Sequence, residues 1–351
     1  MNSYDVMEWG KPLQMAVREV PEPTGSEVLI KVQYCGVCHS DVHIRDGYFD
    51  MGGGKRFHMS ERGMNPPVTM GHEPLGEVVK AGPQAGEVPT GKVRLVYPWT
   101  GCGACARCEE GQDNWCAKPR YIGIQRAGGY GQYLLVPDAK YLIDIGDIDP
   151  AYAPILACSG LTTYSAVRKL MPCKPTDWLV VLGAGGLGLM AIAMLKALGH
   201  ENIAVVDISE DKFPAAREMG AKVTVNPSQP DAQQTLAALE GGVFGAVDLV
   251  GMSQTAELAH AVLRKGGRYV VVGLFGGELT VGLVPLAQRA LTLQGSYVGS
   301  LQELREVVDL ARSGKLKPIP VAVCEPNQIS ETLDKLKSGD VVGRVVAKIG
   351  D

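Results

Sequence analysis

Hydrophobic and polar positions alternate with a period of two along the first part of the chain. Short runs rich in Val, Ile, Leu and Tyr are separated by Gly and Pro, and they cover residues 27–37, 75–82, 92–99, 131–137 and 140–145. This alternation is typical of half-buried β-strands, whose successive side chains point to opposite faces. The pattern therefore predicts a small, irregular barrel or sandwich of short strands.

The pattern changes in the middle of the chain, where whole runs are apolar. Such runs begin near residues 178, 203, 221, 246, 268 and 291. Stretches with helical periodicity lie between them, at residues 186–199, 211–220, 233–240 and 255–267. Strands that are apolar on both faces and alternate with helices indicate a parallel sheet covered on both sides. Six strands within about 120 residues fit the two mononucleotide-binding halves of a Rossmann sheet.

The last part of the chain predicts one helix, at residues 300–314, and a strand at 344–349. The apolar positions on one face of that helix are Leu301, Leu304, Val307, Val308 and Ala311. Because these elements cannot bury a core by themselves, we expect them to rejoin the first domain. The expected fold is α/β, with a β-rich catalytic domain at 1–156, a doubly wound parallel sheet at 157–299 and a returning segment at 300–351.

Length and charge narrow the class of protein. A chain of 351 residues is too long for one ordinary core, which agrees with two domains. The formal net charge is −4 and there is no basic block, so no nucleic-acid partner is expected. No apolar run approaches the roughly 20 residues that span a membrane. The first residues lack the basic and apolar regions of a signal peptide, so we expect a cytoplasmic protein with no membrane partner.

A glycine-rich turn follows the first apolar strand of the middle part. It reads G-x-G-x-x-G, and an acidic residue follows it by the distance expected in a dinucleotide-binding unit. The residues expected to bind the cofactor here are Gly183, Gly185, Gly186, Leu187, Gly188, Asp207 and Lys212. The glycines allow a tight turn and close approach of the pyrophosphate to a helix N-terminus. Asp207 favours NAD over NADP, because a 2′-phosphate would meet its negative charge.

Four of the nine cysteines crowd into one short segment, GCGACARCEEGQDNWC. They are Cys102, Cys105, Cys108 and Cys116. An odd number of cysteines argues against a disulfide framework. Four nearby thiolates suit a closed, structural Zn²⁺ site. An iron–sulfur cluster is the alternative, but the ferredoxin pattern continues C-x3-C-P, and the longer gap before Cys116 departs from it.

The family resemblance described in the next paragraph implies a second metal site, whose ligands come from three separated segments. Cys38 lies in CGVCHSDVH, His72 in GHEPLGEVV and Cys158 in LACSGLTTY. Three protein ligands leave the fourth position of a zinc ion open for substrate. Two thiolates balance the charge of Zn²⁺, so the metal can still stabilise a developing alkoxide.

From about Tyr4 onwards the chain resembles the zinc-dependent medium-chain alcohol dehydrogenases, and most closely their tetrameric, NAD-linked microbial branch. The resemblance rests on CGVCHSDVH, GHEPLGEV, the four-cysteine segment, CSGLTTY and VVLGAGGLGLM. It implies a GroES-like first domain, with one catalytic and one structural zinc per subunit. It also implies reversible oxidation of primary or secondary alcohols to aldehydes or ketones with NAD⁺, in a homotetramer or homodimer.

The resemblance also implies roles for single residues. Ser40 and His43 would relay the proton released by the alcohol, and Asp41 would orient His72. Glu73 would be a movable fourth zinc ligand, and His39 stands where relatives contact a cofactor phosphate. The substrate pocket would be lined by Phe49, Trp99, Tyr121, Leu274 and Tyr297. Such a lining suits medium-sized apolar or aromatic alcohols.

Several alternatives stay open at this point. Ser40 could instead cap a helix that begins at Asp41. Residues 47–67 could form a functional rim or lid, or a disordered excursion. Among enzymes, a polyol, amino-alcohol or threonine dehydrogenase is the alternative, although the four-cysteine segment is intact. In another class, a non-catalytic nucleotide-binding protein would be expected to lack some of the residues named above.

Overall fold

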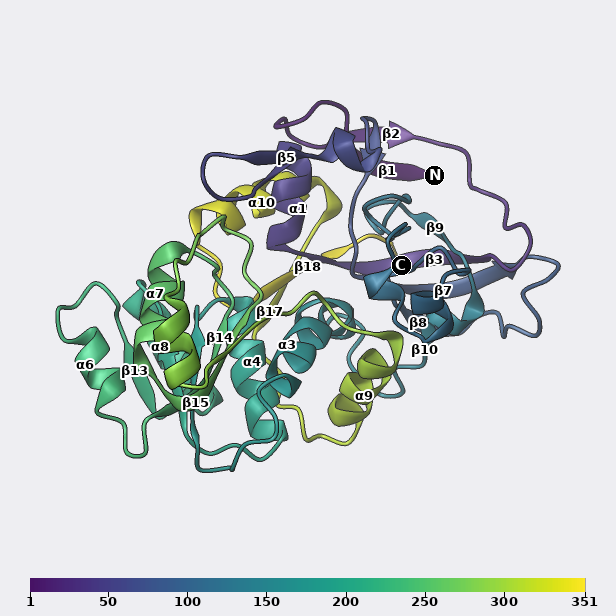
Figure 1. Cartoon of the computed structure of the whole chain (residues 1–351). Coiled ribbons are helices and arrows are strands. Elements are labelled where there is room, and N and C mark those ends of the chain that lie inside the picture. The colour runs from purple at the N-terminus through teal and green to yellow at the C-terminus, as the bar shows by residue number, and fades with distance from the viewer. Residues whose placement is uncertain (351) are drawn as a thin grey trace.

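The computed structural model describes residues 1–350, which form a β-rich half and a parallel-sheet half. In Figure 1 the β-rich half is purple to blue and the parallel-sheet half is teal to green. The yellow C-terminal elements lie between the halves and return to the β-rich one (Figure 1). The predicted fold class is confirmed.

The β-rich half is built around one mixed sheet. Its strand order is β10-β8-β7-β3-β18-β17, and β9 also pairs with β3. The strands of this half are β1 (Asn2–Val6), β2 (Gln14–Val17), β3 (Val28–Val37), β4 (Tyr48–Asp50), β5 (Arg56–His58), β6 (Val68–Thr69), β7 (Pro74–Ala81), β8 (Val93–Val96), β9 (Tyr133–Val136), β10 (Leu142–Ile143), β17 (Val321–Cys324) and β18 (Arg344–Lys348). Strands β2-β1-β6 form a small second sheet. The run at 140–145, predicted as one strand, begins within the 3₁₀ turn η3 (Ala139–Tyr141), and its only strand is the two-residue β10.

The helices of this half, apart from η3, are also short. They are α1 (His39–Asp46), α2 (Ala106–Glu109), η1 (Met59–Arg62), η2 (Asp113–Trp115) and η4 (Ala153–Ala157). Helix α1 begins at His39 with Cys38 as its N-cap, so Ser40 lies in the first turn and does not cap a helix at Asp41. Residues 47–67, expected to lack periodic structure, contain the β4–β5 hairpin and η1.

The second half is a six-stranded parallel sheet in the order β13-β12-β11-β14-β15-β16. Its elements are β11 (Trp178–Leu182), β12 (Ile203–Val206), β13 (Val223–Val225), β14 (Val243–Asp248), β15 (Leu263–Val271), β16 (Thr292–Gly295), α3 (Ser159–Arg168), α4 (Gly186–Ala197), η5 (Glu210–Lys212), α5 (Phe213–Met219), α6 (Ala232–Ala237), α7 (Ser253–Val262) and α8 (Leu283–Gln288). On β11, Leu179 and Val181 belong to one buried cluster, whereas Val180 and Leu182 belong to another. Burial on both faces explains the unbroken apolar run, and the strand order is that of a doubly wound Rossmann sheet.

The remaining elements connect the two halves. They are α9 (Leu301–Arg312), η6 (Pro326–Gln328) and α10 (Ile329–Ser338), followed by β18. Ser300 caps α9 and accepts a hydrogen bond from the Glu303 amide, and α9 packs against α3 and η4. Strand β18 pairs antiparallel with β3, with Val345 opposite Val37. Within residues 1–350, no helix combines the length and apolarity needed to cross a membrane.

Candidate active site

Three chain segments bring four buried side chains together, and we call this set the mixed cluster: Cys38, His72, Glu73 and Cys158. Cys38 follows β3, His72 and Glu73 precede β7, and Cys158 lies between η4 and α3. One donor atom from each residue lies within 4.8 Å of the others. The cluster therefore sits where the β-rich half meets the first helix of the other half.

The free donor atoms of the mixed cluster fit a zinc ion. The Sγ atoms of Cys38 and Cys158 are 3.9 Å apart. In a tetrahedral site with Zn–S bonds of about 2.3 Å, two sulfurs are about 3.8 Å apart. The Nε2 atom of His72 and the Oε2 atom of Glu73 are buried without a hydrogen-bond partner in the described chain. Buried polar atoms without partners are costly, so a ligand that accepts their lone pairs accounts for this arrangement.

Asp41, on α1, fixes the orientation of His72. Its Oδ1 accepts a hydrogen bond from His72 Nδ1 at 3.0 Å. Its Oδ2 accepts from the Tyr130 hydroxyl at 2.9 Å and from the Cys38 amide at 3.0 Å. Burial alone would lower the pKa of His72, but Asp41 and Cys38 together outweigh burial and raise this pKa well above its usual value. With Nδ1 held by a carboxylate, Nε2 is the nitrogen left to bind a metal.

Glu73 is held by Arg344, the first residue of β18, whose guanidinium donates to Glu73 Oε1. Both side chains are buried. Burial raises the pKa of Glu73 to about 7, and the positive charge of Arg344 opposes the shift. On the other side, a Cβ added to Gly36 would lie 2.0 Å from Glu73 Oε2. One carboxylate oxygen of Glu73 therefore accepts a hydrogen bond from Arg344, whereas the other has no hydrogen-bond partner in the described chain.

Helix α1 presents His39 and His43 to an aromatic cluster. The His43 ring centroid is 4.9 Å from that of Phe49, and the His39 ring centroid is 4.8 Å from that of Phe275. Burial lowers the pKa of His43 to about 4, so its imidazole is neutral near pH 7 and can accept a proton. Ser40 is half-buried on the first turn of the same helix.

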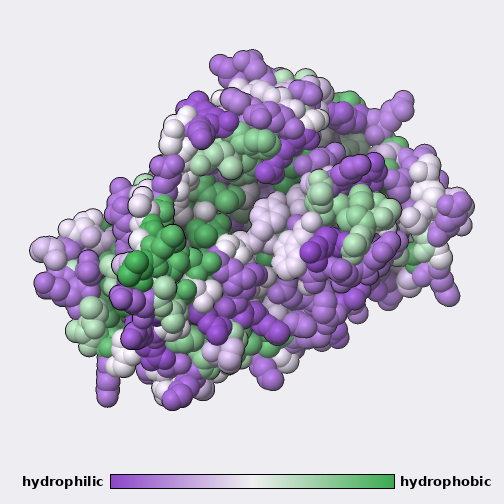
Figure 2. All heavy atoms as spheres, in the orientation of Figure 1, coloured by the Kyte–Doolittle hydropathy of each residue, from purple (hydrophilic) through white to green (hydrophobic). Residues whose placement is uncertain are grey.

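Three aromatic residues form a wall beside His72, and we call Trp99, Tyr121 and Tyr297 the aromatic wall. The ring centroid of Trp99 is 5.3 Å from that of His72, 5.4 Å from that of Tyr121 and 6.3 Å from that of Tyr297. Trp99 Nε1 donates to the Ala157 carbonyl at 3.0 Å, which fixes the indole. Figure 2 shows that the molecule is hollowed between its two halves, with apolar atoms inside the hollow.

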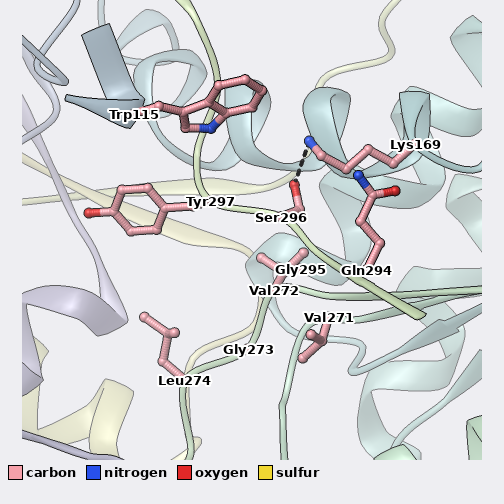
Figure 3. A pocket seen from close by; sticks show the side chains of 10 residues that line it. All are labelled: Trp115, Lys169, Val271, Val272, Gly273, Leu274, Gln294, Gly295, Ser296 and Tyr297. Carbon is pink, nitrogen blue, oxygen red and sulfur yellow. Dashed lines mark hydrogen bonds between the residues drawn. The ribbon is translucent and has the colours of Figure 1, made fainter. Parts of the chain in front are cut away.

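A neighbouring cavity of about 400 Å³ contains only two of the five residues predicted for the substrate pocket. These are Leu274 and Tyr297, which share the cavity with Trp115, Lys169 and Ser296 (Figure 3). Lys169 Nζ donates to Ser296 Oγ at 3.1 Å. The cavity thus extends the aromatic wall towards the ends of β15 and β16.

The glycine-rich turn connects β11 to α4 as its spacing predicts. Gly183 has a φ of +100°, and Gly185 is the N-cap of α4. A Cβ on Gly188 would lie 2.0 Å from the Gly183 carbonyl oxygen, whereas a Cβ on Gly185 would meet nothing within 4 Å. Gly188 therefore permits helix–strand contact, and the open space at Gly185 is available to a ligand.

Asp207 follows β12 and lies next to this turn. Its Oδ2 accepts a hydrogen bond from the Ala184 amide at 2.7 Å, and its Oδ1 accepts from the Ser209 amide at 2.8 Å. Lys212 Nζ is 3.6 Å from Asp207 Oδ1. A fixed carboxylate beside the glycine turn suits the ribose hydroxyls of NAD.

The four cysteines predicted as a closed site also come together, and we call them the cysteine lobe: Cys102, Cys105, Cys108 and Cys116. Cys105 Sγ is 3.6 Å from Cys108 Sγ and 3.8 Å from Cys116 Sγ. These spacings match tetrahedral zinc with four thiolates and no open position. Behind the lobe, Asp113 accepts hydrogen bonds from the Tyr141 hydroxyl at 2.6 Å and the Gly101 amide at 3.3 Å.

Comparisons with known proteins agree with these sites. Residues 24–147 match the alcohol dehydrogenase GroES-like domain, and residues 186–313 match the zinc-binding dehydrogenase domain. An NAD-dependent alcohol dehydrogenase of Sulfurisphaera tokodaii is 37% identical over 349 residues, which cover 99% of each chain. The chain belongs to the zinc-dependent medium-chain alcohol dehydrogenase family.

Solved structures of other members of this family share the whole fold. The alcohol dehydrogenase of Aeropyrum pernix superposes with a TM-score of 0.89 at 28% identity, covering 99% of this chain and 100% of that one. The D-arabinose dehydrogenase of Sulfolobus solfataricus has a TM-score of 0.83, also at 28% identity, covering 99% of this chain and 98% of that one.

Some residues of this dehydrogenase site escaped prediction from the sequence. Arg344 contacts Glu73 across 271 positions of the chain, and no spacing rule connects them. Phe275 lies against His39 from the opposite half. The only available signal for Arg344 was a charged residue at the start of the apolar run RVVAKI, and the only one for Phe275 was an aromatic residue after a buried strand.

Proposed function

We propose that this family member catalyses the reversible oxidation of an alcohol to an aldehyde or ketone, with NAD⁺ accepting the hydride. The observation that carries the proposal is the convergence of unpartnered donor atoms in the mixed cluster. The balanced reaction converts an alcohol and NAD⁺ to a carbonyl compound, NADH and a proton. Zinc held by Cys38, His72 and Cys158 would lower the pKa of the alcohol hydroxyl, and NAD would supply the hydride chemistry.

The protein's own residues would then position the reactants and remove the proton. Asp41 holds His72 with Nε2 directed into the cluster. Ser40 and His43 occupy successive turns of α1, and neutral His43 can take up a proton passed on by Ser40. Glu73, tied to Arg344 through one oxygen, keeps its other oxygen available as a fourth ligand.

The cofactor would bind along the edge between β11 and β12. Gly183, Gly185, Gly186, Leu187 and Gly188 form the turn and the first residues of α4, whose free amides suit the pyrophosphate. Asp207 disfavours a 2′-phosphate, which supports NAD rather than NADP. Lys212 and His39 are further proposed contacts, and a Cβ on Gly186 would lie 2.6 Å from Arg344 Cδ, so Arg344 also borders this region.

The aromatic wall and Phe49 favour medium-sized apolar or aromatic alcohols, primary or secondary. A second candidate is a sugar or another polyol, because the D-arabinose dehydrogenase structure is as similar in sequence as that of the alcohol dehydrogenase. The rings next to His72 support the first candidate, since they offer an apolar surface and few polar partners.

We further propose the domain limits 1–156, 157–299 and 300–351, and a homotetramer or homodimer. Strand β16 is an exposed edge strand of the parallel sheet. Leu283 and Val284 of α8, and Leu293 of β16, are also exposed, and Figure 2 shows apolar atoms gathered over α8. An apolar edge of this kind suits pairing with another subunit. A cytoplasmic location remains a prediction from the sequence.

The test is a panel of primary, secondary, aromatic and polyol alcohols with NAD⁺, together with zinc analysis. We expect NADH formation with apolar alcohols and about two zinc ions per chain. One zinc per chain and no turnover of any alcohol would favour the non-catalytic nucleotide-binding alternative. Preference for polyols would select the second candidate.

A further inference from the structure

Arg62 places a positive charge on an aromatic platform. It lies on η1, within the segment 47–67, and its Cζ is 5.0 Å from the ring centroid of Phe57 and 5.6 Å from that of Phe49. Within residues 1–350, no carboxylate forms a salt bridge with it. The adjacent Glu61 turns back and accepts a hydrogen bond from the His58 amide at 2.8 Å. A guanidinium stacked on rings presents its N–H groups at its edge, where they can donate to an anion.

Arg62 also reaches both sides of the proposed active site. The ring centroid of Phe49, which lies beneath the guanidinium, is 4.9 Å from that of His43. On the other side, exclusion of water from the Tyr297 phenol raises its pKa, and the charge and hydrogen bond of Arg62 oppose this shift. Tyr297 belongs to the aromatic wall, which continues through Trp99 to His72. Arg62 therefore stands at the far end of an aromatic surface that begins at the mixed cluster.

We propose that Arg62 recognises a carboxylate on the substrate, so that the preferred alcohols carry this anion at the end remote from the reacting hydroxyl. The inference rests on the proposed dehydrogenase function and makes its substrate class more specific. The apolar body of such a substrate would lie along the aromatic wall. Its carboxylate would accept two parallel hydrogen bonds from the guanidinium N–H groups, and a neutral alcohol without the carboxylate cannot form this pair.

Arg56 offers a matched control. Its Cζ lies 4.1 Å from the ring centroid of Tyr48, in the same hairpin region. Tyr48 is not part of the aromatic wall, so Arg56 has the same charge and stacking without the same position. If a positive charge anywhere on the segment attracted anionic substrates, both arginines would matter equally.

The experiment compares para-hydroxymethylbenzoate with its neutral amide, and ω-hydroxyhexanoate with hexanol. The enzymes are the unmodified protein, Arg62→Gln, Arg62→Lys and Arg56→Gln. We expect Arg62→Gln to lower the kcat/KM ratio of carboxylate to neutral substrate by roughly 10- to 100-fold, mainly through KM. Arg62→Lys should recover part of the ratio, because it retains charge but lacks the fork. Arg56→Gln should keep the ratio of the unmodified protein.

The possible failures are distinguishable. If neutral alcohols are oxidised but the carboxylates are not preferred, or if Arg62→Gln and Arg56→Gln change the ratio equally, this inference is overturned and the proposed function stands. If no alcohol in either pair is oxidised, the proposed function fails and this inference fails with it.

Discussion

The two metal-binding clusters differ in how the chain builds them. Cys102 and Cys116 lie 14 residues apart, and the whole cysteine lobe belongs to one loop. Cys38 and Cys158 lie 120 residues apart, and Glu73 is held from β18. All members of the mixed cluster are buried, whereas Cys102 and Cys105 are partly exposed. A closed local site stabilises its own loop, whereas an open site assembled by the whole fold is suited to catalysis.

The largest expected effect is the loss of turnover when a ligand of the mixed cluster is substituted. Cys38→Ser should lower kcat by at least about 10³-fold, because zinc stabilisation of the developing charge is worth several kcal/mol. Metal analysis should show that zinc falls from about two to about one per chain. NADH binding, followed by fluorescence titration, should persist because the glycine turn is intact.

Cys324→Ser is a suitable control for loss of a thiol, since this residue lies on β17, outside both clusters. It should retain both zinc ions and full turnover. If Cys38→Ser kept its turnover, the mixed cluster would not be the catalytic site.

The second effect concerns stability rather than chemistry. Cys105→Ser opens the cysteine lobe and should release its zinc, which lowers Tm by roughly 5–10 °C. At low temperature the folded enzyme should still oxidise alcohols. Differential scanning calorimetry and zinc analysis check this result, and a kcat loss as large as that of Cys38→Ser would remove the functional distinction between the clusters.

Each cluster has a buried aspartate that makes hydrogen bonds next to it. Substituting these two aspartates compares the clusters without removing a metal ligand. Asp41 bonds directly to His72, so Asp41→Asn should weaken zinc affinity or turnover by about 10- to 100-fold. Asp113 bonds to Tyr141 and the Gly101 amide, so Asp113→Asn should mainly lower stability, by about 1–3 kcal/mol. Steady-state kinetics and thermal melts measure the two effects. The comparison fails if Asp113→Asn reduces kcat as strongly as Asp41→Asn.

The smallest predicted effect is on the pH dependence of stability, and it comes from His200, which belongs to neither cluster. Burial lowers the pKa of His200, and the charge of Asp177 opposes the shift. As pH falls, the unfolded chain therefore takes up this proton before the folded protein does, so His200 reduces stability below its unfolded pKa of about 6.5. His200→Asn should narrow the difference in unfolding free energy between about pH 7.5 and about pH 5.5. Denaturant titrations at both values measure it, and an unchanged difference would contradict the prediction.

The same contrast explains what could be predicted from the sequence. The cysteine lobe was visible from spacing alone, and the glycine turn was visible because its strand and helix are contiguous. The strands of the parallel sheet were found because Leu179, Val180, Val181 and Leu182 are all buried, which leaves an unbroken apolar run. Cys38, His72 and Cys158 could be grouped only through family resemblance, since nothing in their spacing relates them.

Contacts between elements that lie far apart in the sequence could not be predicted. Arg344 could not be assigned to Glu73, because their pairing depends on β18 joining the sheet beside β3. Arg62 lies in a segment without periodicity, so its position in the sequence does not indicate that its guanidinium lies over the rings of Phe49 and Phe57. The short hairpin of β4 and β5 was missed since segment 47–67 has no clear alternation, and its order comes from contacts with α1.

The pairing of β18 with β3 has a consequence for how the chain folds during its synthesis. Val37 and Val345 are roughly 300 residues apart, so at about 5–20 residues per second a ribosome needs on the order of tens of seconds to supply the partner strand. During that interval the end of β3, which contains Cys35 and is followed by Cys38, has an unpaired edge. The nascent β-rich half is then open to aggregation and thiol oxidation, and it closes only once the second half has been synthesised.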